Sequence, residues 1–354
     1  MKNGKWKIRL LYLPAKLYEL SVRARIALYR NHLFETKKLG IPVISVGNLT
    51  LGGTGKTPCV AYLSGLLRDQ GHSVAILSRG YKRESHGLVE VSDGIDILCT
   101  TREAGDEPYL LAKSCPGVRV VVDPDRFRAG RWLEEHSEVS VFILDDAYQH
   151  LRLFRDLNLL LIDATENLDQ SKMIPFGRLR EPLGGLSRAD AVIVTRSDQT
   201  FDRVSLEKTI SRYSRKGVPV FYAHHKMTNL RRLDKEQIIS ISTFVQRRVA
   251  AISGIARPEK FTTDLLKQGM RIAFRRDFPD HHRYSNQEFL EIVRLAVDAE
   301  ADAIITTEKD AVNLPGELIC QSTIPVYAAQ IEFQCENERD LKSLILKVAS
   351  VNHS

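Results

Sequence analysis

The sequence predicts an α/β fold: a larger α/β/α domain around a mostly parallel sheet, a second and smaller α/β/α domain, and a helix ahead of both. The chain has 354 residues, which exceeds one ordinary domain. From residue 41 onward, short apolar runs of strand length alternate with helical segments, as in β-α-β units. The composition, 43% hydrophobic and 27% charged, allows a full core and excludes a disordered chain or a disulfide scaffold.

Residues 1–40 are predicted to form a basic amphipathic helix. Ten lysines and arginines stand there against Glu19 and Glu35, so this segment holds most of the net charge of +7. Pro14 and Lys16 interrupt the apolar stretch and no small-residue cleavage site follows, which argues against a signal peptide. Two interpretations stay open. Such a helix can lie in a membrane interface with its cations on anionic head groups, or it can pack on its own domain and leave a solvated basic face.

The apolar runs place the larger domain at residues 41–217 and the smaller domain at residues 218–354. The boundary follows a polar stretch at residues 197–202, and no Gly/Ser linker marks it. Strands of the larger domain are predicted at residues 42–46, 73–77, 118–122, 141–144, 157–162 and 191–195. Those of the smaller domain are predicted at residues 219–222, 249–252, 271–274, 303–306 and 325–328.

The net charge indicates which kind of partner the chain binds, and the cysteines indicate the redox compartment. The excess of positive charge calls for an anionic partner, which could be nucleic acid, phospholipid or a phosphorylated substrate. The five cysteines include no CxxC pair, so we expect reduced thiols in a cytoplasmic protein rather than a zinc site or a secreted framework. No stretch approaches the roughly 18 to 20 apolar residues that a spanning helix needs.

A glycine-rich segment follows the first predicted strand and opens a predicted helix, which is the context of a phosphate-binding P-loop. Glycines let backbone N–H groups face phosphate oxygens, Lys56 reaches the β- and γ-phosphates, and the Thr57 hydroxyl binds Mg²⁺. The usual P-loop pattern begins with glycine, and this chain has Thr50 at that position. The larger domain is therefore P-loop NTPase-like, ATP and Mg²⁺ are the expected cofactors, and the predicted binding residues are Thr50, Gly52, Gly53, Thr54, Gly55, Lys56 and Thr57.

A nucleotide site of this kind also needs a carboxylate at the end of a neighbouring strand, where it holds the water shell of Mg²⁺. The predicted strand at residues 141–144 ends in Asp145 and Asp146. Paired acids after an apolar strand can also simply start a turn. Beside a P-loop we favour the metal interpretation, with Asp145 and Thr57 as metal ligands.

Phosphoryl transfer to an acceptor hydroxyl needs a base that takes the proton, and two segments contain candidates. In the first, Asp106 and Glu107 precede Pro108 and a helical run, where they could serve catalysis or cap the helix. In the second, His281 and His282 lie in a loop ahead of a predicted helix. Adjacent histidines point apart on most backbones, so one of them is a candidate proton acceptor or orienter, not half of a metal site.

Taken together, these motifs resemble tetraacyldisaccharide 4'-kinase, the lipid A pathway family of Gram-negative bacteria. The resemblance runs from about residue 41 to residue 311 and rests on the joint order of its segments. They are residues 46–58 with the P-loop, 78–81 (Ser-Arg-Gly-Tyr), 105–108 (Gly-Asp-Glu-Pro), 145–150 (Asp-Asp-Ala-Tyr-Gln-His), 180–182, 188–191, 253–255, 278–281 (Phe-Pro-Asp-His) and 307–311 (Thr-Glu-Lys-Asp-Ala). Thr50 agrees with this family, whereas Ala147 and Tyr148 stand where Gly and Phe are usual.

The resemblance implies a kinase that moves the γ-phosphate of ATP to the 4'-hydroxyl of a tetraacylated glucosamine disaccharide 1-phosphate, giving lipid IVA. It implies two α/β/α domains joined by a short two-stranded link, with the substrate between them. Asp106 would be the base, paired with His281 from the other domain, and the dyad would be complete only when the domains close. By motif match or charge, further candidate site residues are Arg79, Glu107, Arg126, Asp146, His150, Arg180 and Glu181.

The partners expected on this interpretation are the lipid disaccharide and, through the N-terminal helix, the cytoplasmic face of the inner membrane, where the protein would be peripheral. We expect a monomer that binds no nucleic acid. The main alternative is a ParA/MinD-like switch ATPase on membranes or DNA. Such proteins carry a lysine just before the Gly-Gly pair, where this chain has Leu51, and they lack a second α/β domain. A nucleic-acid-binding ATPase is suggested by the charge alone, without a recognition motif.

Overall fold

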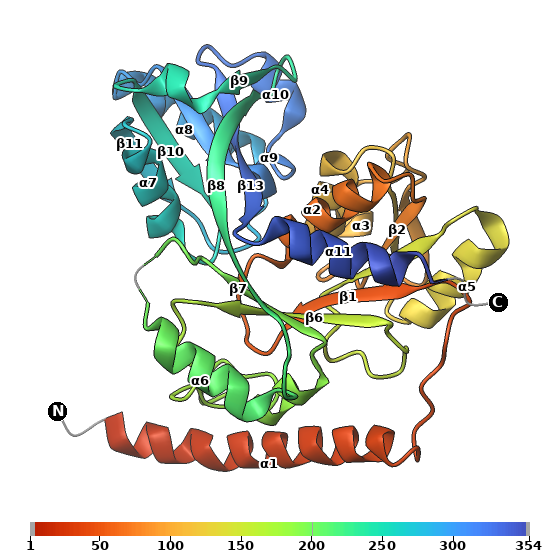
Figure 1. The fold of residues 1–354 in the computed structure, drawn as a ribbon. Helices are drawn as coiled ribbons and strands as arrows, with labels where there is room; N and C mark the ends of the chain where they lie inside the picture. The colour runs from red at the N-terminus through yellow and green to blue at the C-terminus, as the bar shows by residue number, and fades with distance from the viewer. Residues whose placement is uncertain (1–3, 200, 352–354) are drawn as a thin grey trace.

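The computed structural model describes residues 4–199 and 201–351, and only the backbone of residues 4–11. One curved sheet runs through two lobes in the strand order β11-β10-β12-β13-β8-β7-β6-β1-β5-β2-β4-β3 (Figure 1). The larger lobe contains β1 to β7, α1 to α6 and α11, and the smaller lobe contains β9 to β12 and α7 to α10. The strands β8 and β13 belong to both. The predicted α/β fold class, with its mostly parallel sheet, is confirmed.

The sheet of the larger lobe is parallel except for the edge strand β3. Its central strands are buried along their whole length because helices cover both faces, α2, α4 and α11 on one and α5, α6 and α1 on the other. The strands are β1(Val43–Asn48), β2(Val74–Ser78), β3(Val89–Ser92), β4(Arg119–Val122), β5(Val141–Asp145), β6(Leu157–Asp163) and β7(Ala191–Thr195). The helices are α2(Lys56–Arg68), α3(Thr101–Ala104), α4(Asp106–Ser114), α5(Arg126–His136), η1(Leu183–Arg188) and α6(Arg203–Tyr213).

The smaller lobe is likewise a parallel sheet with helices on both faces. Its three parallel strands pair onward with β13, and helices on both faces bury residues such as Leu265 and Phe289. The strands are β9(Ile238–Ser240), β10(Arg248–Ser253), β11(Arg271–Asp277) and β12(Ala303–Thr307). The helices are η2(Ile241–Phe244), α7(Pro258–Lys267), α8(Asn286–Asp298), α9(Glu308–Ala311) and α10(Gly316–Cys320).

Two long strands connect the lobes. β8(Val220–Arg232) begins parallel to β7 in the larger lobe and continues antiparallel to β13(Val326–Cys335) in the smaller one. The sequence predicts only residues 219–222 and 325–328 of them, because the remaining parts are rich in polar residues. The short strands β3 and β9 are also absent from the prediction.

The C-terminal helix α11(Glu338–Ala349) lies on the larger lobe, although the sequence places it in the smaller domain. Leu341 and Ile345 are buried in the same apolar cluster as Val60 and Leu63 of α2. The chain therefore crosses between the lobes twice, outward through β8 and back through β13. A boundary at residue 218 marks the first crossing and not the second.

The N-terminal helix α1(Gly4–Arg30) runs along the base of the larger lobe (Figure 1). Ala15 is buried against that lobe, and the Tyr18 hydroxyl donates a hydrogen bond of 2.9 Å to the carbonyl of Arg180. Leu13, Leu17 and Leu20 are instead 60 to 65% exposed. In the described part of the chain, no helix has the length and apolar character that a bilayer-spanning segment needs.

Candidate active site

A cleft of about 2020 Å³ separates the lobes and is lined by both. It exceeds the roughly 300 to 1,000 Å³ of an ordinary small-molecule site, so it has room for a nucleotide and a second large substrate. The carboxyl ends of two sets of parallel strands face this cleft, which is where ligands bind in sheets of this class. β1 and β5 lead into it from the larger lobe, and β10, β11 and β12 from the smaller one.

The predicted P-loop connects β1 to α2 and lines the cleft. Gly55 has φ +84°, and a Cβ there would lie 2.3 Å from Cε1 of His225 on β8, so only glycine fits this position without rearrangement. Asn48, which is fully buried at the end of β1, donates from Nδ2 to the Thr50 carbonyl at 2.8 Å and to Thr54 Oγ1 at 3.0 Å. Its Oδ1 accepts a hydrogen bond from Lys56 Nζ at 3.3 Å. Asn48 thus holds the loop and its lysine together.

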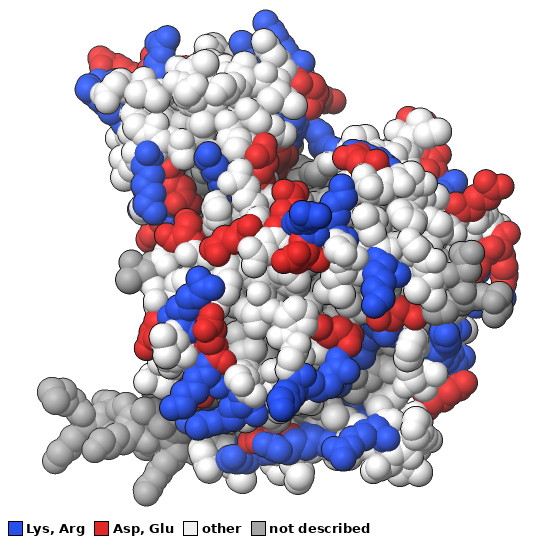
Figure 2. Space-filling model, viewed as in Figure 1, with Lys and Arg blue, Asp and Glu red and all other residues white. Residues whose placement is uncertain are grey.

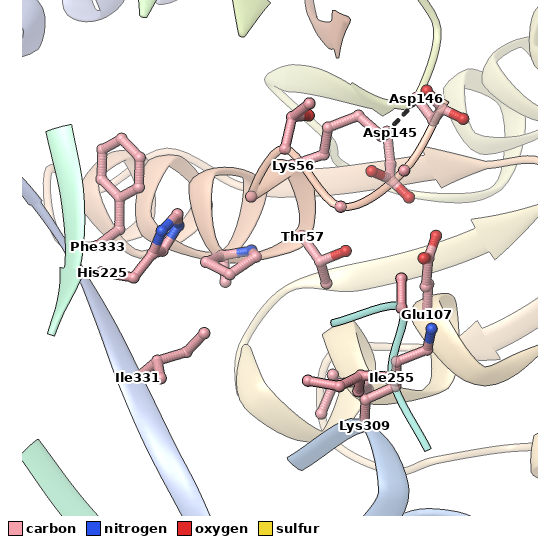
Figure 3. Close-up of a pocket in the computed structure, with 18 of the residues that line it drawn as sticks. Lys56, Thr57, Glu107, Asp145, Asp146, His225, Ile255, Lys309, Ile331 and Phe333 are labelled. Atoms are coloured by element: carbon pink, nitrogen blue, oxygen red, sulfur yellow. Dashed lines mark ion pairs between the residues drawn. The ribbon is translucent and has the colours of Figure 1, made fainter. Parts of the chain in front are cut away.

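Asp145 is the last residue of β5, Asp146 follows it, and both lie beside Lys56 (Figure 3). One Asp145 oxygen accepts a hydrogen bond from Ser78 Oγ at 3.2 Å, and the other is buried without a partner among the described residues. Burial raises the pKa of Asp145 to about 7, and the nearby charges of Glu107 and Asp146 act in the same direction. An acid in this state gains most from a bound cation, because the cation favours the ionised form.

Asp146 is in a different electrostatic environment. Its Oδ1 lies 3.5 Å from Lys56 Nζ, and both of its oxygens accept from Arg180 Nη1 at 2.9 Å. Burial acts to raise the pKa of Asp146, but Lys56 and Arg180 outweigh it, so the pKa lies below its usual value. Asp146 therefore stays ionised and holds two cations at the mouth of the P-loop.

The donors around Asp145 fit Mg²⁺. Thr57, Asp145 and Glu107 point into a common space (Figure 3), and all three offer oxygen atoms, the ligands that Mg²⁺ prefers. Because Mg²⁺ usually keeps several waters and substrate phosphates, a hydroxyl and one free carboxylate oxygen are a sufficient protein contribution.

Asp106 and His281 meet across the cleft, from α4 of the larger lobe and the loop after β11 of the smaller lobe. Asp106 Oδ2 lies 2.8 Å from His281 Nδ1, and His281 Nε2 lies 3.2 Å from Lys309 Nζ. Because a lysine ammonium can only donate, Nε2 is the acceptor and Nδ1 carries the proton that is donated to Asp106. Lys309 is itself 2.7 Å from Asp280 Oδ1.

Asp106 opens α4, but its side chain does not cap the helix, whose N-cap position is Gly105. The carboxylate is buried against the smaller lobe instead. Burial acts to raise the pKa of Asp106, and the hydrogen bonds from His281 and Asn313 outweigh it, so the pKa lies below its usual value. Asp106 is ionised at neutral pH and can accept a proton.

Four more of the predicted site residues line the cleft beside these acids. Three are cations and one is neutral: Arg79, Arg126, Arg180 and His150. Arg126 is buried, its Nη1 donates to the Pro124 carbonyl at 3.1 Å, and its Nε has no described partner. Burial lowers the pKa of Arg126 to about 10, and the nearby charge of Arg79 contributes. Burial also lowers the pKa of His150 to about 4, so His150 is uncharged at neutral pH. Arg79 is exposed, and Arg180 pairs with Asp146.

Glu181 binds neighbouring side chains of the larger lobe with both of its carboxylate oxygens. It is 1% exposed, and its two oxygens accept from Gln149 Nε2 at 2.8 Å and from Arg188 Nη2 at 2.6 Å. With both oxygens occupied, Glu181 fixes the loop that carries Arg180.

Other residues of the site carry no role in the sequence prediction. Asn48 and Lys309 lie inside segments that carried the family resemblance, so a signal for them was present. Arg178 and Arg196, which bind carbonyl oxygens of the P-loop, lie outside any recognisable motif. Arginines are common in this chain, and nothing in the local sequence distinguishes these two.

A P-loop with an oxygen donor set for Mg²⁺, facing an acid–histidine pair across a cleft of this volume, defines a P-loop phosphotransferase. Comparison with known proteins identifies the family. Residues 7–350 match the family described as tetraacyldisaccharide-1-P 4'-kinase, LpxK, and the chain belongs to it.

Relatives match over nearly the whole chain. Tetraacyldisaccharide 4'-kinase of Geobacter sulfurreducens is 40% identical over 339 residues, which cover 96% of this chain and 92% of the relative. The enzyme of the same name from Aquifex aeolicus is 37% identical over 333 residues, with 94% and 96% covered. A crystal structure of LpxK from Aquifex aeolicus in complex with ATP superimposes with a TM-score of 0.79 at 36% identity, covering 95% of this chain and 98% of that one.

Proposed function

We propose that this chain transfers the γ-phosphate of ATP to the 4'-hydroxyl of tetraacyldisaccharide 1-phosphate, the reaction after which its family is named. The ATP complex of the Aquifex relative supports ATP as the donor. The observation that carries the proposal is the contact of 2.8 Å between Asp106 and His281, which lines the same cleft as Lys56. A proton acceptor at this contact would serve an acceptor hydroxyl that approaches the P-loop.

The donor side uses the larger lobe. The backbone N–H groups of the P-loop and Lys56 would bind the triphosphate, and Thr57 and Asp145 would hold Mg²⁺, with Glu107 close by. Bound Mg²⁺ neutralises negative charge on the phosphate oxygens during transfer. Lys56 is kept in place by Asn48 and Asp146, so it is already oriented when the nucleotide arrives.

The acceptor side uses the contact between the lobes. The 4'-oxygen forms a bond to the γ-phosphorus while the bond from that phosphorus to the bridging oxygen of ADP breaks. Asp106 takes the hydroxyl proton, and His281 orients the carboxylate by its Nδ1–H hydrogen bond. Lys309 fixes the His281 tautomer from the other side. The contact of 2.8 Å between Asp106 and His281 supports this role for the pair.

The cations beside Asp145 are suited to anionic groups. Arg126 is buried and its Nε has no partner among the described residues. An anion bound next to it would offset the cost of burying its charge, which lowers its pKa. Together with Arg79 and Arg180 it would bind phosphate oxygens or stabilise the charge of the transition state. His150, which is neutral, would donate or accept a hydrogen bond in the same region.

The helix α1 would hold the protein on the cytoplasmic face of the inner membrane as a peripheral protein. A substrate with four acyl chains is confined to a bilayer, so its kinase must work there. Leu13, Leu17 and Leu20 expose apolar area, and Lys and Arg side chains line the lower edge of the molecule over α1 (Figure 2). Because one chain supplies both the P-loop and the Asp106–His281 pair, we expect it to act as a monomer.

The test is transfer of labelled γ-phosphate from ATP to purified tetraacyldisaccharide 1-phosphate in detergent micelles, with Lys56→Ala as the control. We expect label in the lipid with the wild-type protein and none with the control. Hydrolysis of ATP without labelled lipid would contradict the proposal. If membranes or DNA then stimulated that hydrolysis, a switch ATPase would be the better description.

A further inference from the structure

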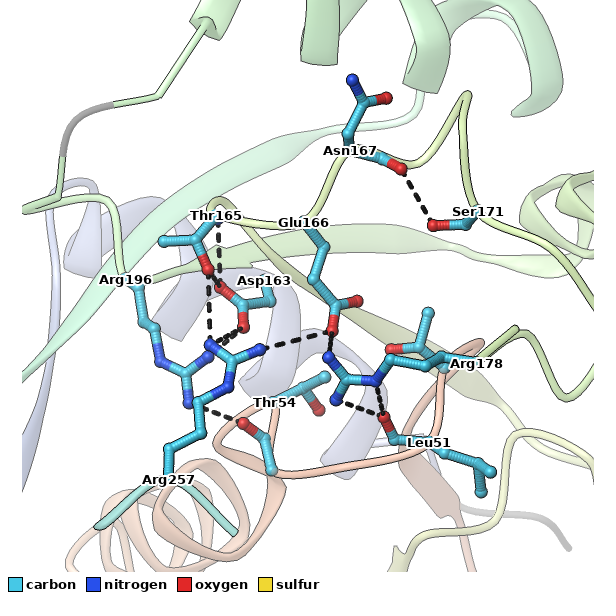
Figure 4. Close-up of polar contacts among 12 residues, drawn as sticks. Leu51, Thr54, Asp163, Thr165, Glu166, Asn167, Ser171, Arg178, Arg196 and Arg257 are labelled. Carbon is cyan, nitrogen blue, oxygen red and sulfur yellow. Dashed lines mark hydrogen bonds and ion pairs between the residues drawn. The ribbon is translucent and has the colours of Figure 1, made fainter. Parts of the chain in front are cut away.

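The outer side of the P-loop is held by side chains that bind its carbonyl oxygens (Figure 4). Arg178 Nε donates to the Leu51 carbonyl at 2.9 Å, and Arg196 Nη2 donates to the Gly53 carbonyl at 2.7 Å. Thr195 Oγ1 donates to the Thr54 carbonyl at 2.9 Å. With these carbonyls engaged from outside, the loop amides are free to face a phosphate. The shape of the P-loop therefore depends on where the two arginines are held.

Two carboxylates hold these arginines. Asp163, at the end of β6 and 1% exposed, is ion-paired with Arg196. Glu166, in the turn that follows, lies 2.7 Å from Arg178 Nη1. Both contacts lie within the larger lobe.

A third arginine reaches the same carboxylates from the smaller lobe. Arg257 Nη1 lies 3.3 Å from Asp163 Oδ2, and its Nη2 lies 3.6 Å from Glu166 Oε1 (Figure 4). Arg257 is the N-cap residue of α7 and is followed by Pro258, and α7 is anchored in the core of the smaller lobe through Phe261 and Leu265. The position of this guanidinium therefore follows the position of the smaller lobe.

We propose that Arg257 is a positioning residue that couples the smaller lobe to the P-loop through Asp163 and Glu166, so that ATP binding and the Asp106–His281 contact favour each other. This rests on the proposed use of ATP at the P-loop. Arg257 follows β10 and His281 follows β11, so both move with the same lobe. Docking of Arg257 and formation of the Asp106–His281 pair are then two contacts made by one rigid body.

The charges explain why nucleotide would strengthen this coupling. When Arg257 is docked, three guanidinium groups face two carboxylates, so this cluster of five side chains carries one excess positive charge beside the P-loop. A bound triphosphate is an anion at that place, so it lowers the free energy of docking the third arginine. By linkage, docking must raise the affinity for ATP by the same factor.

The test measures ATP binding in the presence of Mg²⁺ and without lipid, by calorimetry on the full chain. We expect Arg257→Ala to raise the dissociation constant for ATP about tenfold, within the range of coupling between sites. Arg257→Lys should lie between this variant and the wild type, because an ammonium cannot face both carboxylates at once. The matched control is Arg275→Ala, since Arg275 is 35% exposed against 37% for Arg257 and pairs with Asp277 inside the smaller lobe.

A second measurement follows the lobe contact itself, through hydrogen exchange of the backbone amides of residues 278 and 280–284. ATP should slow this exchange in the wild type and in Arg275→Ala, but not in Arg257→Ala. If Arg257→Ala binds ATP within about twofold of the wild type, the proposal is wrong. If its affinity falls while ATP still slows the exchange as in the wild type, Arg257 acts on the P-loop alone and the coupling is refuted.

Thermal unfolding of each variant checks its fold. Because no lipid is used, failure of the wild type to phosphorylate lipid would overturn the proposed function and not this inference. Normal phosphate transfer with ATP binding that does not depend on Arg257 would overturn only the inference.

Discussion

Replacement of Asp106 by Asn separates proton transfer from structure more cleanly than other changes at this site. The side chain keeps its shape, and its Oδ1 can still accept from His281 Nδ1. What is lost is the capacity to take a proton. A positioned general base contributes about 10²- to 10⁴-fold to a rate, so kcat should fall by that factor, which is about 3 to 5 kcal/mol of activation free energy at 1.36 kcal/mol for each tenfold.

ATP binding should be almost unchanged in Asp106→Asn. The polar partners that the structure gives Asp106 are His281 and Asn313, and neither belongs to the P-loop. The KM for ATP should therefore stay within about twofold of the wild type, which is the pattern of an interaction made only in the transition state. Since the pKa of Asp106 lies below its usual value, wild-type turnover should not decline through loss of this base between about pH 7 and pH 5.

The assay is transfer of labelled phosphate to the lipid disaccharide in micelles, measured at saturating ATP from about pH 5 to pH 9. Asp69→Asn is the control, because Asp69 is an exposed acid on the larger lobe that pairs with its neighbour Arg68. Retention of more than about a tenth of the wild-type kcat by Asp106→Asn at all pH values would remove Asp106 from the role of base. An equal fall in ATP affinity would show instead that the variant disturbs the nucleotide site.

Three further predictions concern the loop, the metal and the membrane. Gly55→Ala should abolish ATP binding as measured by calorimetry, because alanine at a φ of +84° costs about 1 to 2 kcal/mol and its Cβ would overlap the His225 ring. Adding His225→Ala removes the overlap but not the backbone cost, so it should restore binding only in part. Burial raises the pKa of Asp145 to about 7, so protons compete with Mg²⁺ below that pH: the Mg²⁺ concentration for half-maximal activity should rise from pH 8 to pH 6, and Asp145→Asn should abolish this pH dependence. Leu17→Ser with Leu20→Ser should weaken sedimentation with vesicles containing about 30% anionic lipid, while calorimetric ATP binding stays normal; unchanged sedimentation would exclude α1 as the anchor.

The sequence predicts much of the larger lobe because its signals are local. The P-loop is defined by consecutive residues between a strand and a helix, and Asp145 ends a buried strand. Most predicted strands lie within one or two residues of those observed, since a strand covered on both faces must be apolar throughout. The exceptions are β8 and β13, which extend through polar residues that line the cleft, and β11, which ends three residues beyond its predicted end.

The N-terminal segment shows where sequence and structure divide. The pattern left open whether this helix lies in a membrane interface or packs on its own domain with a solvated basic face, because an apolar stripe looks the same in both cases. In the structure one face packs through Ala15 and Tyr18, while Leu13, Leu17 and Leu20 stay exposed. Packing of α1 on its own lobe is therefore observed, and contact of the exposed leucines with a membrane stays a prediction.

The sequence by itself determined the kind of fold and the P-loop with its acids, and it gave Asp106 and His281 as candidate site residues. These depend on neighbouring residues or on a family resemblance. Only the tertiary structure decided that Asp106 and His281, 175 residues apart, are in contact, that α11 returns to the larger lobe, and that Arg178, Arg196 and Arg257 surround the carboxylates beside the P-loop. The physical reason is that such contacts depend on how β8 and β13 set the two lobes against each other, which leaves no periodic or local trace in the chain.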